Sequence, residues 1–143
     1  MYLKFADYDK ETKISTVQIK HMGKVFTAYS KLIEEDLPHE SKFTGCRFAE
    51  KKAIIKALKY EYKVKKEKCK ECENFIKALE QYKLFDPSEK SAKVMYRQLN
   101  RRIKEVNKLA DKITSLEFSL KTDILGQTMF INKLNKKSKE VNK

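Results

Sequence analysis

Residues that form turns are scarce in this sequence, which has only three glycines and two prolines among 143 residues. Because glycine and proline dominate turns, their scarcity predicts long regular elements. The sequence also has no run of 18 apolar residues, so we expect no transmembrane helix and no membrane partner. Residues 1–7 lack the layout of a secretion signal. Three cysteines without such a signal predict a reducing cytosol and free thiols.

Negative charge is also in short supply: 33 Lys and Arg residues stand against 20 Asp and Glu residues, for a net charge of +13. A positive field attracts nucleic acid, nucleotides, phosphates or an anionic membrane surface, and the charge alone does not indicate which of these is the partner. Only four of the basic residues are arginine, whose planar fork binds phosphate through two hydrogen bonds and stacks on rings. The four are Arg47, Arg97, Arg101 and Arg102, and the last three fall within six residues.

The first part of the sequence predicts a small sheet followed by a long helix. Over residues 1–32, β-branched and aromatic residues bounded by turns predict two or three antiparallel strands. Over residues 44–82, apolar residues alternate between three- and four-residue spacing, which is the heptad pattern of a helix that packs along a seam. Only Lys65 interrupts this seam.

The second half predicts another helix, over residues 87–116, with the same apolar spacing. The sequence Asp86-Pro87-Ser88-Glu89 before it is a compact start signal, with a capping Asp, a Pro at the first helical position and a Glu three residues after the cap. A short connection between two such helices makes an antiparallel hairpin. We expect residues 117–143 to form a short extended segment and a basic tail. The fold class is therefore α+β, in a single domain spanning residues 1–143.

The predicted helices carry more apolar surface than one hairpin and a small sheet can cover. A first helix of nearly 40 residues is about 57 Å long at 1.5 Å per residue, against about 30 Å for the diameter of a compact domain of this mass. Second apolar rows include Ala57 and Tyr60 on the first helix and Leu109 and Leu116 on the second. The sequence therefore predicts a homo-oligomer.

The strongest functional signal is a basic stripe on the second helix. At 100° per residue, its four members lie within an arc of about 60°, on the side opposite the apolar residues. They are Arg97, Arg101, Lys104 and Lys108. Asn100 and Asn107 flank the stripe, and Tyr82 and Tyr96 offer flat rings, so the set suits a ligand with phosphates and bases. The alternative is a solvated basic helix face, which is the commoner meaning of such a run.

A second candidate phosphate site is the start of the first helix, Thr44-Gly45-Cys46-Arg47-Phe48. Free amides there, a glycine that allows close approach and the Arg47 guanidinium would hold a phosphate. The alternative is an ordinary capped helix with Arg47 exposed.

Metal binding and catalysis find little support in the sequence. Cys69 and Cys72 form a C-x-x-C, but a structural zinc needs two more ligands, and the remaining cysteine and two histidines are not suitably paired. Both thiols fall in the heptad seam, where cysteine packs as a small hydrophobe. Because no nucleophile-base pair, glycine-rich phosphate loop or buried carboxylate pair stands out, we expect no metal, no cofactor and no enzymatic activity.

Three stretches of the sequence resemble the first family of phage Thoeris anti-defence proteins. They span residues 24 to about 113. They are Lys24-Val25-Phe26-Thr27-Ala28, the segment from Phe43-Thr44-Gly45-Cys46-Arg47-Phe48 to Lys59, and Met95-Tyr96-Arg97-Gln98-Leu99-Asn100-Arg101-Arg102-Ile103-Lys104.

This resemblance implies a sponge, a protein that binds an immune signal without degrading it, in the cytoplasm of the infected bacterial host. Family members capture glycocyclic ADP-ribose made by TIR-domain sensors, and some capture cyclic di- and trinucleotides at separate pockets of a hexamer. The family fold pairs a small sheet with two long helices, and its pockets lie between subunits. We therefore expect a dimer or hexamer that takes a small cyclic nucleotide.

The resemblance carries the ligand role onto a small set of matching positions. Those in the second helix are Arg97, Asn100, Arg101 and Lys104, and Arg47 matches at the first helix start. Tyr82 stands where the family has a stacking phenylalanine, and a phenol stacks nearly as well. From the residues alone two other functions remain open. One is a basic helical hairpin that binds nucleic acid, which the resemblance disfavours. The other is a coiled-coil adaptor for another protein.

Overall fold

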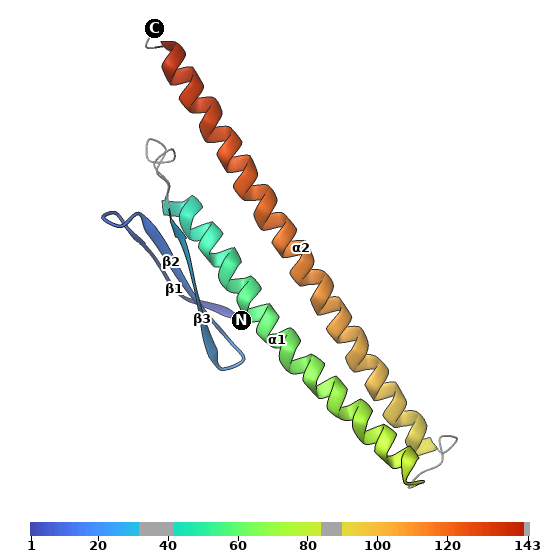
Figure 1. The fold of residues 1–143 in the computed structure, drawn as a ribbon. Helices are drawn as coiled ribbons and strands as arrows, with labels where there is room; N and C mark the ends of the chain where they lie inside the picture. The colour runs from blue at the N-terminus through green and yellow to red at the C-terminus, as the bar shows by residue number, and fades with distance from the viewer. Residues whose placement is uncertain (32–41, 84–89, 142–143) are drawn as a thin grey trace. The chain divides into compact units, whose positions relative to one another are not determined.

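The computed structural model describes residues 1–31, 42–83 and 90–141. Three strands come first, and two long helices follow them (Figure 1). The elements are β1 (Tyr2–Asp9), β2 (Ile14–His21), β3 (Lys24–Lys31), α1 (Lys42–Gln81) and α2 (Lys90–Val141). The α+β class predicted from the sequence is therefore confirmed. The capping sequence expected at residues 86–89 lies outside the described residues.

The three strands form an antiparallel sheet in the order β1-β2-β3. Between β1 and β2, the Asp9 carboxylate accepts a hydrogen bond from the Glu11 amide at 2.9 Å, and the Asp9 carbonyl accepts one from Lys13 N at 2.8 Å. These bonds close the polar turn. The turn from β2 to β3 has φ values of 53° at Met22 and 75° at Gly23, and two positive values in sequence match the right-handed twist of a hairpin.

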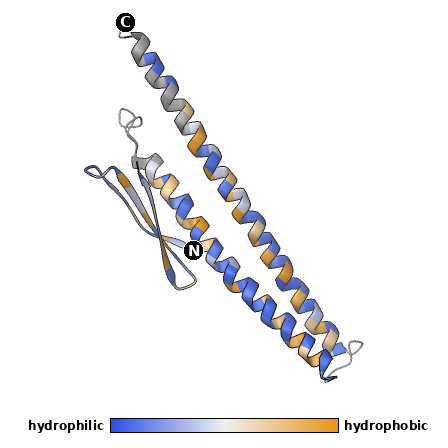
Figure 2. Ribbon diagram, viewed as in Figure 1, coloured by the Kyte–Doolittle hydropathy of each residue, from blue (hydrophilic) through white to orange (hydrophobic). Residues whose placement is uncertain are grey.

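The chain forms two compact units, and each helix contributes to both. The sheet unit contains residues 1–57 and 114–143, and the hairpin unit contains residues 58–113. The single domain expected from the sequence stays a prediction, because the two units share both helices. Figure 2 shows apolar residues recurring among polar ones along α1 and α2, as helices with one buried side require.

In the sheet unit, one face of the sheet packs against the first turns of α1. The core consists of Val17, Ile19 and Ala28 from the sheet and Ala49 and Ala53 from the helix. Small residues on the helix let its backbone come close to the sheet. The approach is tightest at Gly45, where an added Cβ would lie 2.3 Å from the Ser15 Oγ. Gly45 therefore allows close packing of helix against sheet, and the ligand approach expected from the sequence at this helix start stays a prediction.

Lysine side chains from α1 complete the sheet unit. Lys52 Nζ donates a hydrogen bond to the Tyr29 carbonyl at 3.2 Å, and Lys56 Nζ donates one to the Thr27 carbonyl at 2.8 Å. These carbonyls belong to β3, an edge strand. On the other side of α1, Lys51 bonds Ser119 at 3.3 Å and forms an ion pair with Asp123, both on α2.

In the hairpin unit, α1 and α2 run antiparallel and bury apolar residues along the seam between them. Its buried members are Leu58, Ile76, Ala92, Leu99, Val106, Leu109 and Ile113. The heptad spacing predicted most of this set. Ile103, which shares that spacing, is instead 40% exposed.

The prediction for the C-terminal part of the chain is wrong. Residues 117–141 are not an extended segment and tail, because α2 continues without a break to Val141. A single glycine, Gly126, costs a helix only about 1 kcal/mol relative to alanine. The bonds from Lys51 to Ser119 and Asp123 hold this part of α2 against α1. The described helices include none that is both long enough and apolar enough to span a membrane.

Candidate anion-binding groove

The hairpin unit has a groove of about 440 Å³ along one side of its seam. It lies within the range of about 300–1,000 Å³ that is usual for small-molecule sites. Four of its lining residues are basic. Lys65, Lys68 and Cys69 come from α1, and Gln98, Arg101, Arg102 and Glu105 come from α2.

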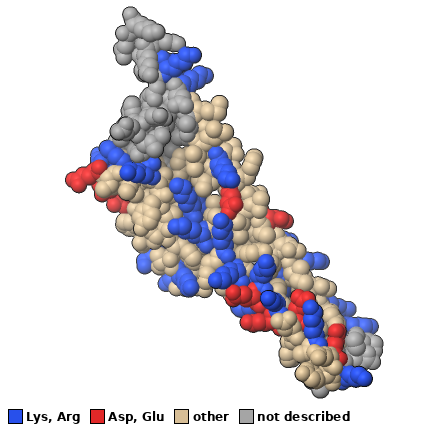
Figure 3. All heavy atoms as spheres, viewed as in Figure 1, with Lys and Arg blue, Asp and Glu red and all other residues tan. Residues whose placement is uncertain are grey.

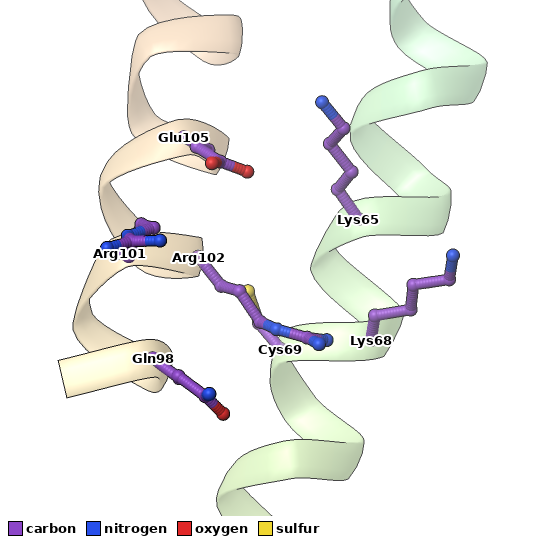
Figure 4. Close-up of a pocket in the computed structure, with 7 residues that line it drawn as sticks. All are labelled: Lys65, Lys68, Cys69, Gln98, Arg101, Arg102 and Glu105. Atoms are coloured by element: carbon purple, nitrogen blue, oxygen red, sulfur yellow. The ribbon is translucent and has the colours of Figure 1, made fainter. Parts of the chain in front are cut away.

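Helical spacing gathers these residues along the groove. On α1 the lining residues are at positions i, i+3 and i+4, and on α2 they are at i, i+3, i+4 and i+7, so each set occupies one helix face. Figure 4 shows Gln98, Arg102 and Glu105 extending from α2 toward α1, with Arg101 on the outer flank of α2. The apolar seam beneath them fixes the separation of the two helices.

Most of the positive charge in the groove is not neutralised within the protein. Lys65 is the exception, because its ammonium forms an ion pair with Glu61 at 2.8 Å, one turn earlier on α1. This hydrogen bond raises the pKa of Lys65, and Glu105 adds to the effect electrostatically. Within the described ranges, Lys68, Arg101 and Arg102 form no hydrogen bond or ion pair with another side chain. Three cations are thus available to a ligand.

Cys69 forms part of the floor of the groove. Its thiol is half-buried and free, and burial raises its pKa, although the nearby Arg102 guanidinium acts in the opposite direction. A thiol with a raised pKa is a weak nucleophile at neutral pH. Cys72 is likewise half-buried and free. The pair therefore packs near the seam, and the arrangement suits binding and not covalent chemistry.

A second groove, of about 330 Å³, lies along the hairpin and shares Cys69 with the first. Ile103 and Val106 give it an apolar wall, and Asn107 and Glu73 lie among the residues that line it. Two lysines, Lys66 and Lys70, complete its lining. It has no arginine, so it is the poorer phosphate site.

Only one of the six predicted ligand residues lines the first groove, namely Arg101. Arg97, Asn100 and Lys104 are exposed on α2 and line neither groove. Tyr82 is 71% exposed, immediately after the last residue of α1, and it also lines neither groove. The roles of these four residues stay predictions.

Arg47, the sixth predicted ligand residue, belongs to the sheet unit. Its guanidinium lies 3.8 Å from the Asp123 carboxylate, which also pairs with Lys51. The bond from Lys51 lowers the pKa of Asp123, and Arg47 contributes to the same shift. Arg47 thus has a carboxylate of the protein as a distant ion-pair partner, and its ligand role stays a prediction.

The sequence analysis missed Lys65, Lys68, Gln98, Arg102 and Glu105. One signal pointed to the groove, namely the interruption of the heptad seam at Lys65. A charged residue at a seam position opens a gap between two helices, because it cannot pack as an apolar residue does. The other signal was the group of three arginines within six residues. The basic stripe contains Arg97 and not Arg102, so Arg102 was not chosen as a ligand residue.

Lys and Arg cover much of the surface visible in Figure 3, with Asp and Glu between them. The described residues contain no group of three or more His, Cys, Asp or Glu side chains able to hold a metal ion. Comparisons with protein-family models, with curated proteins and with solved structures found no significant match.

Proposed function

We propose that this protein is a phage anti-defence sponge, which binds a cyclic nucleotide immune signal and sequesters it without degrading it. The ligand is of the glycocyclic ADP-ribose type, and cyclic di- or trinucleotides are further ligands. The groove along the hairpin is the proposed site for the phosphates. The protein acts in the cytoplasm of the infected bacterial host.

The observation that carries this proposal is the set of unpaired cations in the groove. Arginine binds phosphate through two parallel hydrogen bonds, and such charge-assisted bonds are roughly twice as strong as neutral ones. Two adjacent arginines and a lysine across the seam offer donors to two phosphates at once. The groove holds no activated nucleophile, in keeping with capture without turnover.

The resemblance of residues 24 to about 113 to the Thoeris anti-defence family supports the same proposal. It supplies the ligand class, which positive charge alone does not choose. It also makes Arg97, Asn100, Lys104 and Tyr82 candidates for ligand contacts in an assembled oligomer, where a neighbouring subunit would form the other wall.

A homo-oligomer, either a dimer or a hexamer, is part of the proposal. Its support is that large apolar side chains are exposed on β1 and on α2, where contact with a second copy of the chain would cover them. On β1, Tyr2 is 58% exposed and Leu3 is 51% exposed. On α2, Phe118 is 72% exposed and Met129 is 64% exposed. Native mass spectrometry would report the subunit number and the number of bound ligands together.

Sequestration needs affinity and not turnover. The protein must outnumber the signal and bind it more tightly than the receptor does. A dissociation constant near 10 nM corresponds to roughly −11 kcal/mol. Two charge-assisted phosphate contacts in the groove, together with one or two bases stacked outside it on a ring such as Tyr82 in an assembled oligomer, would reach this order of magnitude.

The test is capture of cyclic ADP-ribose isomers, the glycocyclic ones included, by the purified protein, followed by release on heating and mass spectrometry of the ligand. We expect intact ligand, and recovery of hydrolysed ligand alone would indicate an enzyme. Replacing Arg101 and Arg102 together by alanine should weaken binding about a hundredfold. The matched control replaces Lys93 and Lys112, two exposed lysines of α2 outside both grooves, and should bind within about threefold of the wild type.

Salt dependence separates the sponge from a nucleic-acid-binding hairpin. Binding to duplex or single strands would fall steeply with salt, because each phosphate contact releases counterions. Capture in a groove with two phosphate contacts should depend on salt much less. A steep dependence together with tight duplex binding would contradict the proposal.

A further inference from the structure

Glu105 is the one acid that lines the cationic groove. Its side chain is exposed, and Figure 4 shows it pointing from α2 toward Lys65 on α1. Lys65 forms its ion pair with Glu61 instead. Among the residues that the structure describes, no hydrogen bond or ion pair engages the Glu105 carboxylate. Its oxygens are therefore available to a molecule in the groove.

A carboxylate in this position is a disadvantage for a site that binds only phosphate. Like charges a few ångströms apart repel, and the repulsion is stronger near a protein surface than in bulk water. An ionised carboxylate accepts hydrogen bonds and donates none, so it needs a ligand that carries donors. The ligand that fits both features has phosphates for the arginines and hydroxyl or amino donors for Glu105.

The other lining residues indicate which donors these are. Apart from Cys69, the groove has no apolar or aromatic side chain on which a base would stack. A base gains most of its affinity from such stacking. The groove therefore suits the sugar and phosphate part of a nucleotide, whose donors are the ribose hydroxyls. Carboxylates have the same role in dinucleotide-binding folds, where an Asp or Glu accepts a hydrogen bond from the ribose 2′-hydroxyl.

We propose that Glu105 is a specificity-determining residue, which accepts hydrogen bonds from the ribose hydroxyls of the ligand while Arg101 and Arg102 hold its phosphates. This inference rests on the proposed function, since it concerns the same groove. Glu105 makes the site select a ribose-bearing ligand and reject small inorganic anions that would otherwise occupy the arginines. Selection of this kind combines an attraction for one ligand with a repulsion of its competitors.

Three ligands test the inference on the full-length protein, by calorimetric titration of the wild type and of Glu105→Gln. They are cyclic ADP-ribose, its 2′-deoxy analogue and inorganic pyrophosphate, which has two phosphates and no hydroxyl. In the glutamine variant we expect cyclic ADP-ribose to bind about tenfold more weakly. Pyrophosphate should bind about threefold more tightly, because a repelling charge is gone. The wild type should prefer cyclic ADP-ribose to its 2′-deoxy analogue, and the variant should lose that preference.

The matched control is Asp111→Asn, which removes the same charge from an exposed position of α2 outside both grooves. It should leave all three affinities within about twofold of the wild type. If Glu105→Gln strengthens cyclic ADP-ribose and pyrophosphate alike, Glu105 is only a repelling charge and the inference fails. Unchanged affinities, or an equal loss for both ligands, would also overturn it. If the wild type does not bind cyclic ADP-ribose at all, the proposed function itself fails.

Discussion

The two units of this molecule use the same kinds of charged side chain in opposite ways. In the sheet unit, Lys51 and Arg47 bond to the carboxylate of Asp123, and Lys52 and Lys56 bond to carbonyl groups of β3. In the hairpin unit, Arg101 and Arg102 line a groove with no described side chain as their partner. The net charge of the sequence does not distinguish these two sets of cations. The sheet-unit cations contact groups of the fold itself, whereas Arg101 and Arg102 of the hairpin unit are left for a ligand.

Within the sheet unit, two helical glycines differ in their surroundings, and this difference gives the prediction with the largest effect on stability. Gly45→Ala should destabilise the sheet unit, because the new methyl group meets the buried Ser15 Oγ. Overpacking costs about 1–3 kcal/mol, against a gain of about 1 kcal/mol in helix propensity. Gly126→Ala is the matched control, since nothing lies within 4 Å of the new atom. It should stabilise the protein by about 0.5–1 kcal/mol.

Urea unfolding of both variants measures these differences. Removal of the hydroxyl in Ser15→Ala should reduce the cost of Gly45→Ala, because the closest contact is then gone and only a Cβ–Cβ distance of 3.3 Å is left. Equal effects of Gly45→Ala in the presence and absence of the Ser15 hydroxyl would contradict the close approach of helix and sheet.

The second prediction is a substitution in the hairpin unit that should weaken ligand binding and increase the stability of the fold. Lys65→Leu places an apolar side chain at the one position that interrupts the predicted seam. Burial of part of a leucine should outweigh the loss of the Lys65–Glu61 pair, for a net gain of about 1 kcal/mol. The same change removes a cation and fills part of the groove, so cyclic ADP-ribose should bind at least about tenfold more weakly. Thermal unfolding and calorimetric titration measure the two effects. A variant that is more stable and binds normally would exclude Lys65 from the site.

The third prediction concerns pH and has the smallest effect. The pKa of Asp123 lies below its ordinary value of 3.8, chiefly because Lys51 donates a hydrogen bond to it. The folded protein therefore binds fewer protons at Asp123 than the unfolded chain does in this range. The resulting stabilisation is present above pH 3.8 and is lost as the pH falls through the lower, folded-state pKa. Asp123→Asn should flatten the acid limb of a plot of stability against pH, while Asp111→Asn should leave it unchanged.

The strands and helices were largely predictable, because each is defined by spacing along its own chain. The strand region, the long first helix and the start of the second follow from alternation and heptad spacing. Residues 117–141 were not predicted, because their apolar pattern is weak and Gly126 resembles a stop signal. Contacts such as Lys51 with Asp123 join residues 72 positions apart, and no local pattern contains them.

For the candidate site, the sequence predicted the right segment of α2 and a neighbouring part of its surface. The basic stripe contains Arg97, Arg101 and Lys104, whereas the groove takes Gln98, Arg102 and Glu105 together with Arg101. Helical periodicity gives the angles between residues on one helix. These angles place Arg102 beside the apolar face of α2 and Arg97 opposite it. They do not show that the side chains of α1 leave a groove next to Arg102, so Arg102 was not singled out.

The sequence by itself determined the number and type of elements, the absence of an apolar run long enough for a membrane span, and the excess of positive charge. These properties depend on residues close together in the chain or on composition. The tertiary structure decided which cations are neutralised, where α2 ends and which faces of the two helices enclose a groove. Those properties depend on distances between residues far apart in the chain, and such distances exist only once the helices have packed.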